Sequence, residues 1–164
     1  MIRSGTGGPV ELYFDDIAVG TTFDLGVVDV DRDEMLAFAR RYDPQWYHVD
    51  VEAARASAYG DVIASGFYTA SLFMRAYADT VLSRAAADAS PGLEELRWTA
   101  PVYGGDRLRI SLDVLDAALS GTKPNVGTLT LTATMTRLAN GDRPEAVAVR
   151  MRFRGWFARR PTRD

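Results

Sequence analysis

Two different hydrophobic periods divide the chain. In the C-terminal half, apolar and polar residues alternate over three stretches, around residues 107–114, 128–136 and 147–154. A period of two is typical of strands with one buried face. Asn140-Gly141, which separates the last two stretches, predicts a hairpin turn because both residues tolerate positive φ.

The N-terminal half carries the helical signals. Asp31 followed by Glu34 has the spacing of a capping box, and the apolar residues behind it recur at helical spacing until Pro44 ends the helix. A short helix is predicted over Val51–Ala56, and a longer one from Phe67 to about Leu82. The longer helix is apolar over most of its circumference, which is typical of a helix wrapped by other structure.

These elements predict an α+β fold. Their order is an extended segment over Thr21–Val30, then the helices, then several long antiparallel strands. A sheet with one apolar face and a broadly apolar helix are both buried if the sheet curls around the helix. We therefore expect a curled antiparallel sheet wrapped around the central helix.

The composition is that of one ordinary globular domain. The chain has 164 residues, 47% hydrophobic and 25% charged, so we expect a single domain over 11–160 and a flexible N-terminal tail over 1–10. Cysteine is absent, which excludes disulfides and a thiolate nucleophile and agrees with a cytoplasmic location. A net charge of −3 gives no reason to expect nucleic-acid binding, and no apolar run has the ~18 residues of a membrane span.

Arginines gather near the C-terminus. They are Arg150, Arg152, Arg154, Arg159 and Arg160. The alternate spacing of the first three predicts the solvent-exposed face of a strand, and an anion-binding site is the alternative.

The candidate catalytic pair follows the first helix. His48 is the only histidine, and Asp43 lies five residues before it, across Pro44. We expect the segment between them to form a loop that points both side chains at one place, which neither a regular helix nor a strand does at this spacing. An imidazole beside a carboxylate can move protons near neutral pH. The alternative is an incidental loop histidine next to an Asp-Pro turn.

A second candidate feature leads into the long helix, where the sequence reads Ile63-Ala-Ser-Gly66. The first amides of a helix lack intrahelical acceptors and lie at the positive end of its dipole. The N–H of Gly66 is therefore a candidate to polarise a carbonyl, as an oxyanion hole does. Alternatively, Ser65 is a plain helix cap and Gly66 an ordinary helix start.

Three stretches share a pattern with known proteins. The first runs Phe38-Ala-Arg-Arg-Tyr-Asp-Pro-Gln-Trp-Tyr-His-Val-Asp50, followed by Ala53-Ala54 and then Tyr59-Gly-Asp-Val-Ile-Ala-Ser-Gly66. The second runs Leu96-Arg-Trp-Thr-Ala-Pro-Val-Tyr-Gly-Gly-Asp-Arg-Leu108, and the opening one is Tyr13-Phe-Asp-Asp-Ile-Ala-Val-Gly-Thr-Thr-Phe23. Over roughly residues 12–157 the chain resembles the MaoC-like acyl dehydratases, the (R)-specific enoyl-CoA hydratases.

The resemblance implies a hot-dog fold, a homodimer and a hydratase of fatty acid metabolism that adds water reversibly to a trans-2-enoyl thioester. It places the family's catalytic aspartate on Asp43, its histidine on His48 and its carbonyl-polarising glycine on Gly66. The expected partner is an acyl-CoA or acyl-carrier thioester, so coenzyme A enters as part of the substrate. Neither a metal nor another cofactor is expected.

Two departures from the family pattern leave the acyl group open. Gln45 stands where many members have asparagine, with the proline moved next to Asp43, and Ser65 stands where many have histidine. The residues expected to bind substrate are Gln45, Trp46, Tyr47, Ser65, Phe67 and Tyr68. Four of them carry bulky rings, which favours a short or compact acyl group; core packing of those rings is the alternative.

Two other functions remain open. Hot-dog thioesterases commonly carry a carboxylate within the central helix, where this chain offers only Asp79, near the far end. The second alternative is a non-catalytic, acyl-thioester-binding partner subunit. A degenerate copy would be free to lose Asp43 or His48, and this chain has kept both.

Overall fold

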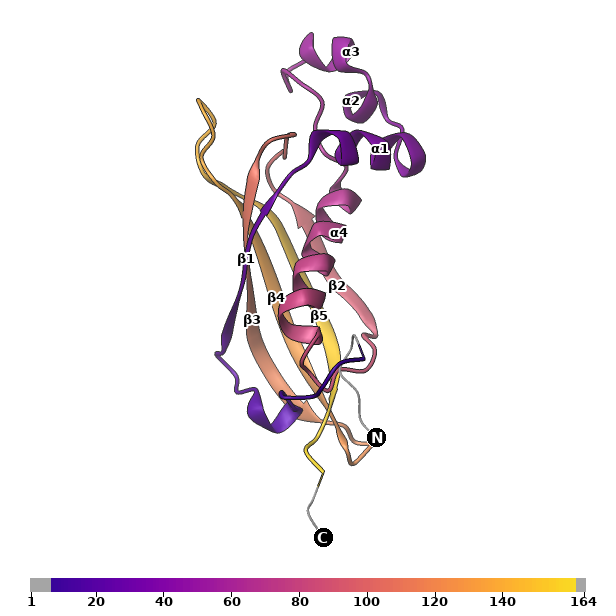
Figure 1. The fold of residues 1–164 in the computed structure, drawn as a ribbon, viewed down its shortest axis with the longest axis vertical. Coiled ribbons are helices and arrows are strands. Elements are labelled where there is room, and N and C mark those ends of the chain that lie inside the picture. The colour runs from indigo at the N-terminus through magenta and orange to yellow at the C-terminus, as the bar shows by residue number, and fades with distance from the viewer. Residues whose placement is uncertain (1–6, 162–164) are drawn as a thin grey trace.

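A five-stranded antiparallel sheet dominates the computed structural model, with strand order β1-β3-β4-β5-β2 (Figure 1). The strands are β1 (Thr22–Asp29), β2 (Gly92–Trp98), β3 (Arg107–Leu119), β4 (Val126–Arg137) and β5 (Ala146–Ala158). The structure describes residues 7–161, so residues 1–6 of the expected tail lie outside it.

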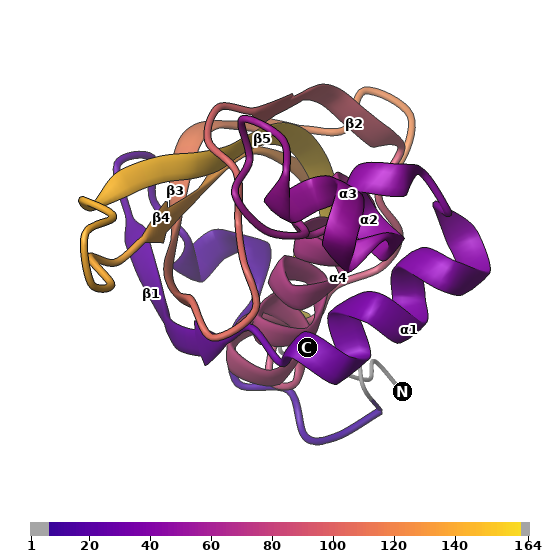
Figure 2. The ribbon, with the colours of Figure 1, turned by 90° about the horizontal axis from the view of Figure 1, so that it is seen from above.

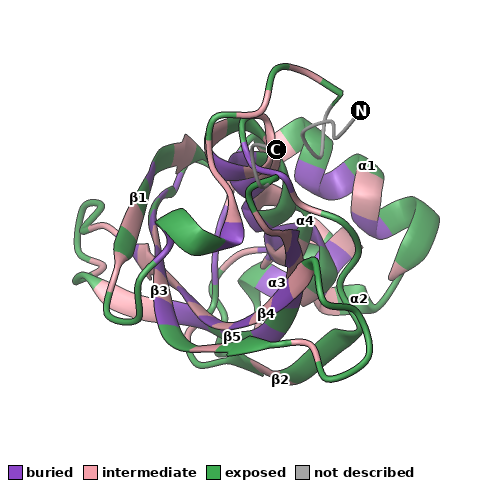
Figure 3. Ribbon diagram, turned by 90° about the horizontal axis from the view of Figure 1, so that it is seen from below, coloured by how far each residue is buried: buried purple, intermediate pink, exposed green. Residues whose placement is uncertain are grey.

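The inner face of the sheet follows the predicted alternation. In β4, Leu129, Leu131 and Met135 are buried while the threonines between them are half-buried, and β3 has the same pattern (Figure 3). The predicted hairpin joins β4 to β5, but its tip is longer than a two-residue turn. Asn140 pairs with Arg143, and of the Asn-Gly pair only the glycine has a positive φ, 57°.

The central helix lies in the concave side of this sheet, which arcs around it in Figure 2. Helix α4 (Gly66–Tyr77) continues into a short π-helix, η2 (Ala78–Leu82), so the predicted helix is present over its expected length. Phe73 and Tyr77 stack on each other, and both rings meet Phe153 of β5 edge-on. The predicted α+β arrangement, a curled antiparallel sheet around a central helix, is confirmed.

Shorter helices overhang the N-terminal end of α4 (Figure 1). They are α1 (Arg32–Tyr42), α2 (Trp46–Val49) and α3 (Val51–Arg55), and a 3-10 turn, η1 (Phe14–Asp16), precedes β1. The Asp31 carboxylate caps α1 by accepting from the backbone N–H groups of Asp33 and Glu34, which is the Asp31 half of the predicted capping box. No helix within residues 7–161 is both long and apolar enough to cross a membrane.

The arginines of β5 lie on its exposed face, as predicted. The Nε atoms of Arg152 and Arg154 lie 2.9 and 2.6 Å from the Glu94 carboxylate on the neighbouring β2. The two arginines beyond the strand pair with aspartates of η1. These cations are engaged with carboxylates of the same chain, so the alternative of an anion site gains no support.

Candidate active site

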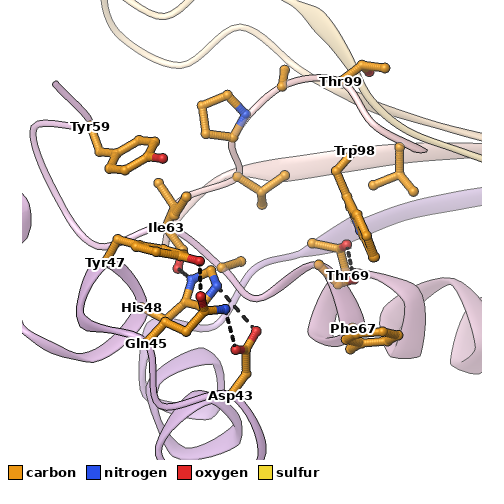
Figure 4. Close-up of a pocket in the computed structure, with 16 residues that line it drawn as sticks. Asp43, Gln45, Tyr47, His48, Tyr59, Ile63, Phe67, Thr69, Trp98 and Thr99 are labelled. Atoms are coloured by element: carbon orange, nitrogen blue, oxygen red, sulfur yellow. Dashed lines mark hydrogen bonds and ion pairs between the residues drawn. The ribbon is translucent and has the colours of Figure 1, made fainter. Parts of the chain in front are cut away.

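A cavity of about 450 Å³ lies where the overhanging helices meet the N-terminal end of α4 (Figure 4). Asp43, His48 and Gly66 all line it, although 23 positions separate the first from the last in sequence. The opposite wall is formed by the end of β2 and the segment that follows it, residues 98–102. The structure therefore brings the three predicted catalytic residues to one cavity.

Asp43 is placed by the end of α1. It is the C-cap residue, with φ −150° and ψ 64°, because the proline that follows disfavours helical backbone. Ser65 Oγ donates to Oδ2 at 2.7 Å, and Gln45 Nε2 donates to Oδ1 at 2.7 Å. The hydrogen bond from Ser65, then that from Gln45 and the nearby His48 ring, hold the pKa of Asp43 below its ordinary value of 3.8, against the opposing effect of partial burial.

His48 lies on α2 rather than in the loop that the sequence predicted. The helix is only four residues long and begins after Gln45, so its periodicity was too brief to detect. The His48 ring is buried, and its Nδ1 lies 2.7 Å from the carbonyl oxygen of Ile63. Its Nε2 lies 3.3 Å from Asp43 Oδ2. The two side chains therefore do converge, with one ring nitrogen fixed by backbone and the other facing the carboxylate.

Ser65 and Gly66 open α4 beside this pair. Ser65 is fully buried, and its hydroxyl makes no helix-capping bond; it donates to Asp43 instead. As the first residue of α4, Gly66 has no intrahelical acceptor for its N–H. A Cβ built on Gly66 would overlap the indole ring of Trp98, so the backbone here is approached closely.

Two of the expected substrate-binding residues lie away from the cavity. Tyr68 is two positions beyond Gly66 on α4, about 200° around the helix, and so faces α1. It is buried there, with its ring 5.7 Å from Phe38 and its pKa raised to about 12 by burial first and nearby carboxylates second. Trp46 does not line the cavity; it is 48% exposed, and its ring lies 5.4 Å from that of Tyr47. Gln45, Tyr47 and Phe67 do line the cavity, whereas Ser65 is buried outside its lining and contacts it only through its hydrogen bond to Asp43.

Residues that the sequence did not single out complete the cavity. Tyr59 and Trp98 both line it, and Trp98 meets Phe67 edge-on at 5.5 Å. Both residues lie within stretches that carry the family resemblance, but no local signal distinguishes them from core aromatics. Only the packing of β2 against α4 brings the indole over the start of the helix.

A second cavity, of about 370 Å³, lies farther along α4. Successive turns of the helix supply Ala70, Met74 and Tyr77, and the inner face of β5 supplies Met151 and Phe153. Leu93 of β2 forms the outer wall. We call this groove, lined by these six residues, the apolar trough; it lies beside α4 from Ala70 to Tyr77, nearer the C-terminal end of the helix than the first cavity.

The donor set of the described chain does not suggest a metal centre. Within residues 7–161, no three His, Asp or Glu side chains come close enough together to hold an ion.

Comparison with known proteins identifies relatives over most of the chain. The family model described as "MaoC like domain" matches residues 16–136. The solved structure of a MaoC-like dehydratase from Rhodospirillum rubrum superposes with a TM-score of 0.82 and 32% identity, covering 93% of this chain and 100% of that one. An (R)-hydratase from A. caviae involved in PHA biosynthesis superposes with a TM-score of 0.65 and 26% identity, covering 88% and 98%.

A sequence relative is similar over a shorter region. The 3-hydroxyacyl-thioester dehydratase Z of Mycobacterium tuberculosis is 37% identical over 84 residues, which are 50% of this chain. The matched region spans 56% of that protein, so the chain covers little more than half the length of this curated relative.

Proposed function

We infer that this chain is a hydratase or dehydratase of acyl thioesters, because it belongs to the family of MaoC-like domains. The reaction is the reversible addition of water to a trans-2-enoyl thioester, which gives a 3-hydroxyacyl thioester. The observation that carries the proposal is the 3.3 Å approach of His48 Nε2 to Asp43 Oδ2 in a cavity that also contains the start of α4. The dehydratase and the (R)-hydratase among its relatives support this class of reaction.

His48 is the group that takes the proton from water. The Ile63 carbonyl oxygen can only accept a hydrogen bond, so Nδ1 carries the ring proton and Nε2 keeps a lone pair in the neutral ring. Asp43 stays ionised because its hydrogen-bond donors lower its pKa, and its charge stabilises the imidazolium that forms. Water held between the two groups loses a proton to Nε2 as its oxygen bonds to C3.

Gly66 stabilises the charge that this attack creates. The electrons of the C2–C3 double bond move toward the thioester, and the carbonyl oxygen gains negative charge. A backbone N–H aimed at such an oxygen is worth about 3 kcal/mol, and the N–H of Gly66 is free for this role at the helix terminus. The His48 imidazolium then returns its proton to C2, so the elements of water are added and the pair regains its starting state.

The acyl tail lies in the apolar trough. The trough follows α4 from Ala70 to Tyr77, a rise of about 10 Å, and Ala70 lies about one helical turn beyond Gly66 of the first cavity. Of the four rings that favoured a compact acyl group, Trp46 and Tyr68 lie outside the cavity, but Tyr59 and Trp98 line it, so the space for a longer tail is the trough. A thioester with its carbonyl at Gly66 can therefore extend a longer, unbranched tail toward Phe153.

Hydrolysis of the thioester is less well supported. The one acidic residue near the end of the central helix, Asp79, lies in η2 and is largely exposed. Its carboxylate accepts from Arg75 at 2.7 Å, and it lies outside the catalytic cavity. A non-catalytic binding role would not require the hydrogen bonds and the His48 contact that orient Asp43.

The direct test is the loss of ultraviolet absorbance when enoyl-CoA is hydrated. We expect turnover of crotonyl-CoA and of trans-2-octenoyl-CoA by the wild type, and losses of at least about a hundredfold in kcat for Asp43→Asn and His48→Ala. Asp116→Asn, an exposed carboxylate on β3, should behave as the wild type. Unchanged rates in the two site variants would end the case for this pair. Release of free thiol as the main reaction would point to a thioesterase.

We also propose that the protein works as a homodimer. Phe67, Met74, Leu93 and Trp98 are all more than 45% exposed, and all border the catalytic cavity or the apolar trough. They lie beside β2, an edge strand of the sheet. An apolar border next to the free edge of a sheet is what a second copy would cover.

A further inference from the structure

We propose that Tyr47 is a positioning residue, whose hydroxyl anchors Gln45 so that the glutamine amide holds Asp43 in its working orientation. The catalytic meaning of this inference rests on the proposed function. The contact itself does not, because it is a hydrogen-bonded chain that can be examined in the protein alone.

The chain of contacts runs through three side chains of one short segment. The Tyr47 hydroxyl donates to Gln45 Oε1, and Gln45 Nε2 donates to Asp43 Oδ1 at 2.7 Å (Figure 4). A carboxylate accepts only, so the amide must turn its NH2 group toward Asp43 and its oxygen toward a donor. The Tyr47 hydroxyl is that donor.

The Gln45 side chain needs such an anchor because, without the Tyr47 hydroxyl, nothing holds its amide oxygen in one place. It is exposed, and a glutamine side chain with several rotatable bonds loses entropy when it is held in one place. Tyr47 is held firmly in comparison: its ring packs 4.5 Å from the His48 ring and 5.8 Å from that of Tyr59. The Tyr47 carbonyl also accepts from the Ile63 N–H at 3.0 Å.

Few other groups act on Asp43. His48 faces it from α2 at 3.3 Å, and Ser65 donates to Oδ2 from the residue before α4. Within residues 7–161 no Lys or Arg forms an ion pair with Asp43. In the described part of the chain, Gln45 is therefore the only side chain that donates to Oδ1, and losing its anchor leaves that oxygen to water. The hydrogen bond from Gln45 is also one cause of the lowered pKa of Asp43.

The test follows Asp43 itself by carboxyl-carbon NMR titration, with its resonance assigned from Asp43→Asn. In Tyr47→Phe, which keeps the ring and removes only the hydroxyl, we expect the Asp43 titration to move to higher pH. We expect kcat/KM for crotonyl-CoA at neutral pH to fall about three- to tenfold, as loss of one hydrogen bond allows. Tyr42→Phe, on the exposed end of α1, makes the same chemical change and should leave the titration in place.

The double variant separates anchoring from a direct effect. If Tyr47 acts through Gln45, then Gln45→Ala shifts the Asp43 titration, and adding Tyr47→Phe to it shifts it no further. An Asp43 titration in Tyr47→Phe that matches the wild type overturns the inference, as does a further shift in the double variant. A wild type that titrates as expected but does not hydrate enoyl-CoA would refute the proposed function and leave the anchoring intact.

Discussion

At Gly66 the chain needs a residue without a side chain. The sequence suggested a chemical reason for this glycine, the close approach of a substrate carbonyl to the helix terminus. The structure adds a second reason, which is packing. A Cβ there would overlap the ring of Trp98, which is 46% exposed and stands against Phe67. These two explanations predict different effects of a substitution at Gly66. The exposed Trp98 ring can move to make room for a Cβ, whereas the carbonyl of a bound substrate cannot.

We therefore expect Gly66→Ala to lower kcat/KM for crotonyl-CoA by at least about tenfold, the lower range for a disturbed oxyanion donor. In a Trp98→Ala background, Gly66→Ala should lower kcat/KM by a much smaller factor if the indole ring is the only group that the new Cβ meets. An equally large loss of kcat/KM in that background would show that the new Cβ meets the bound substrate instead. Gly121→Ala is the matched control, since nothing lies within 4 Å of a Cβ at that position. Full activity of Gly66→Ala would contradict both explanations.

At the scale of elements, a salt bridge ties the start of α1 to the segment that orients His48. Arg32 donates to both oxygens of Asp61, at 2.8 and 2.9 Å, and Asp61 Oδ1 also accepts from the Val62 N–H. The next residue, Ile63, supplies the carbonyl that binds His48 Nδ1. The pair therefore helps to hold the backbone on which the ring orientation depends.

Asp61→Asn should lower the free energy of unfolding at pH 7 by about 1 kcal/mol, because the pair is about one-third exposed. Arg32 chiefly lowers the pKa of Asp61 below 3.8, so this contribution is complete above that pH and is lost as pH falls through the lowered value. Urea unfolding of both proteins across this range should show the difference shrinking toward acid. Asp79→Asn removes the more exposed pair with Arg75 and should change little. A difference that persists at low pH would show that the charge of Asp61 is not the cause.

The whole molecule presents its apolar border along β2, and the proposed dimer predicts what happens when that border is charged. Leu93→Lys places a cation at the outer wall of the apolar trough, where Leu93 is 54% exposed. Burying that charge in an interface is unfavourable, so we expect a wild-type dimer and a variant shifted toward monomer in sedimentation at equal concentration.

Leu119→Lys adds the same charge at the end of β3, away from the β2 edge, and should leave the dimer intact. A wild type that sediments as a monomer at assay concentration would refute the dimer. Unaltered association of Leu93→Lys would place the interface elsewhere on the molecule.

Much of the fold could be predicted because its signals are local. The alternation of apolar and polar residues through 128–136 predicts which face of β4 is buried, and Asp31 and Pro44 mark the two ends of α1. The helix apolar around most of its circumference predicted the enclosing sheet. The element that was missed is short: α2 spans one turn, which is too little for a helical period to show, so His48 was expected in a loop.

The sequence by itself determined the longer helices and strands, the candidate pair Asp43 and His48 and the glycine that opens α4, because spacing and residue type are local properties. Only the tertiary structure decided which side chains share the cavity. It brought Ser65 and Gln45 onto the carboxylate of Asp43 and Trp98 over Gly66, and it turned Tyr68 and Trp46 away. These outcomes depend on the rotation of each helix and the packing of distant segments, and neither is written in the spacing of residues along the chain.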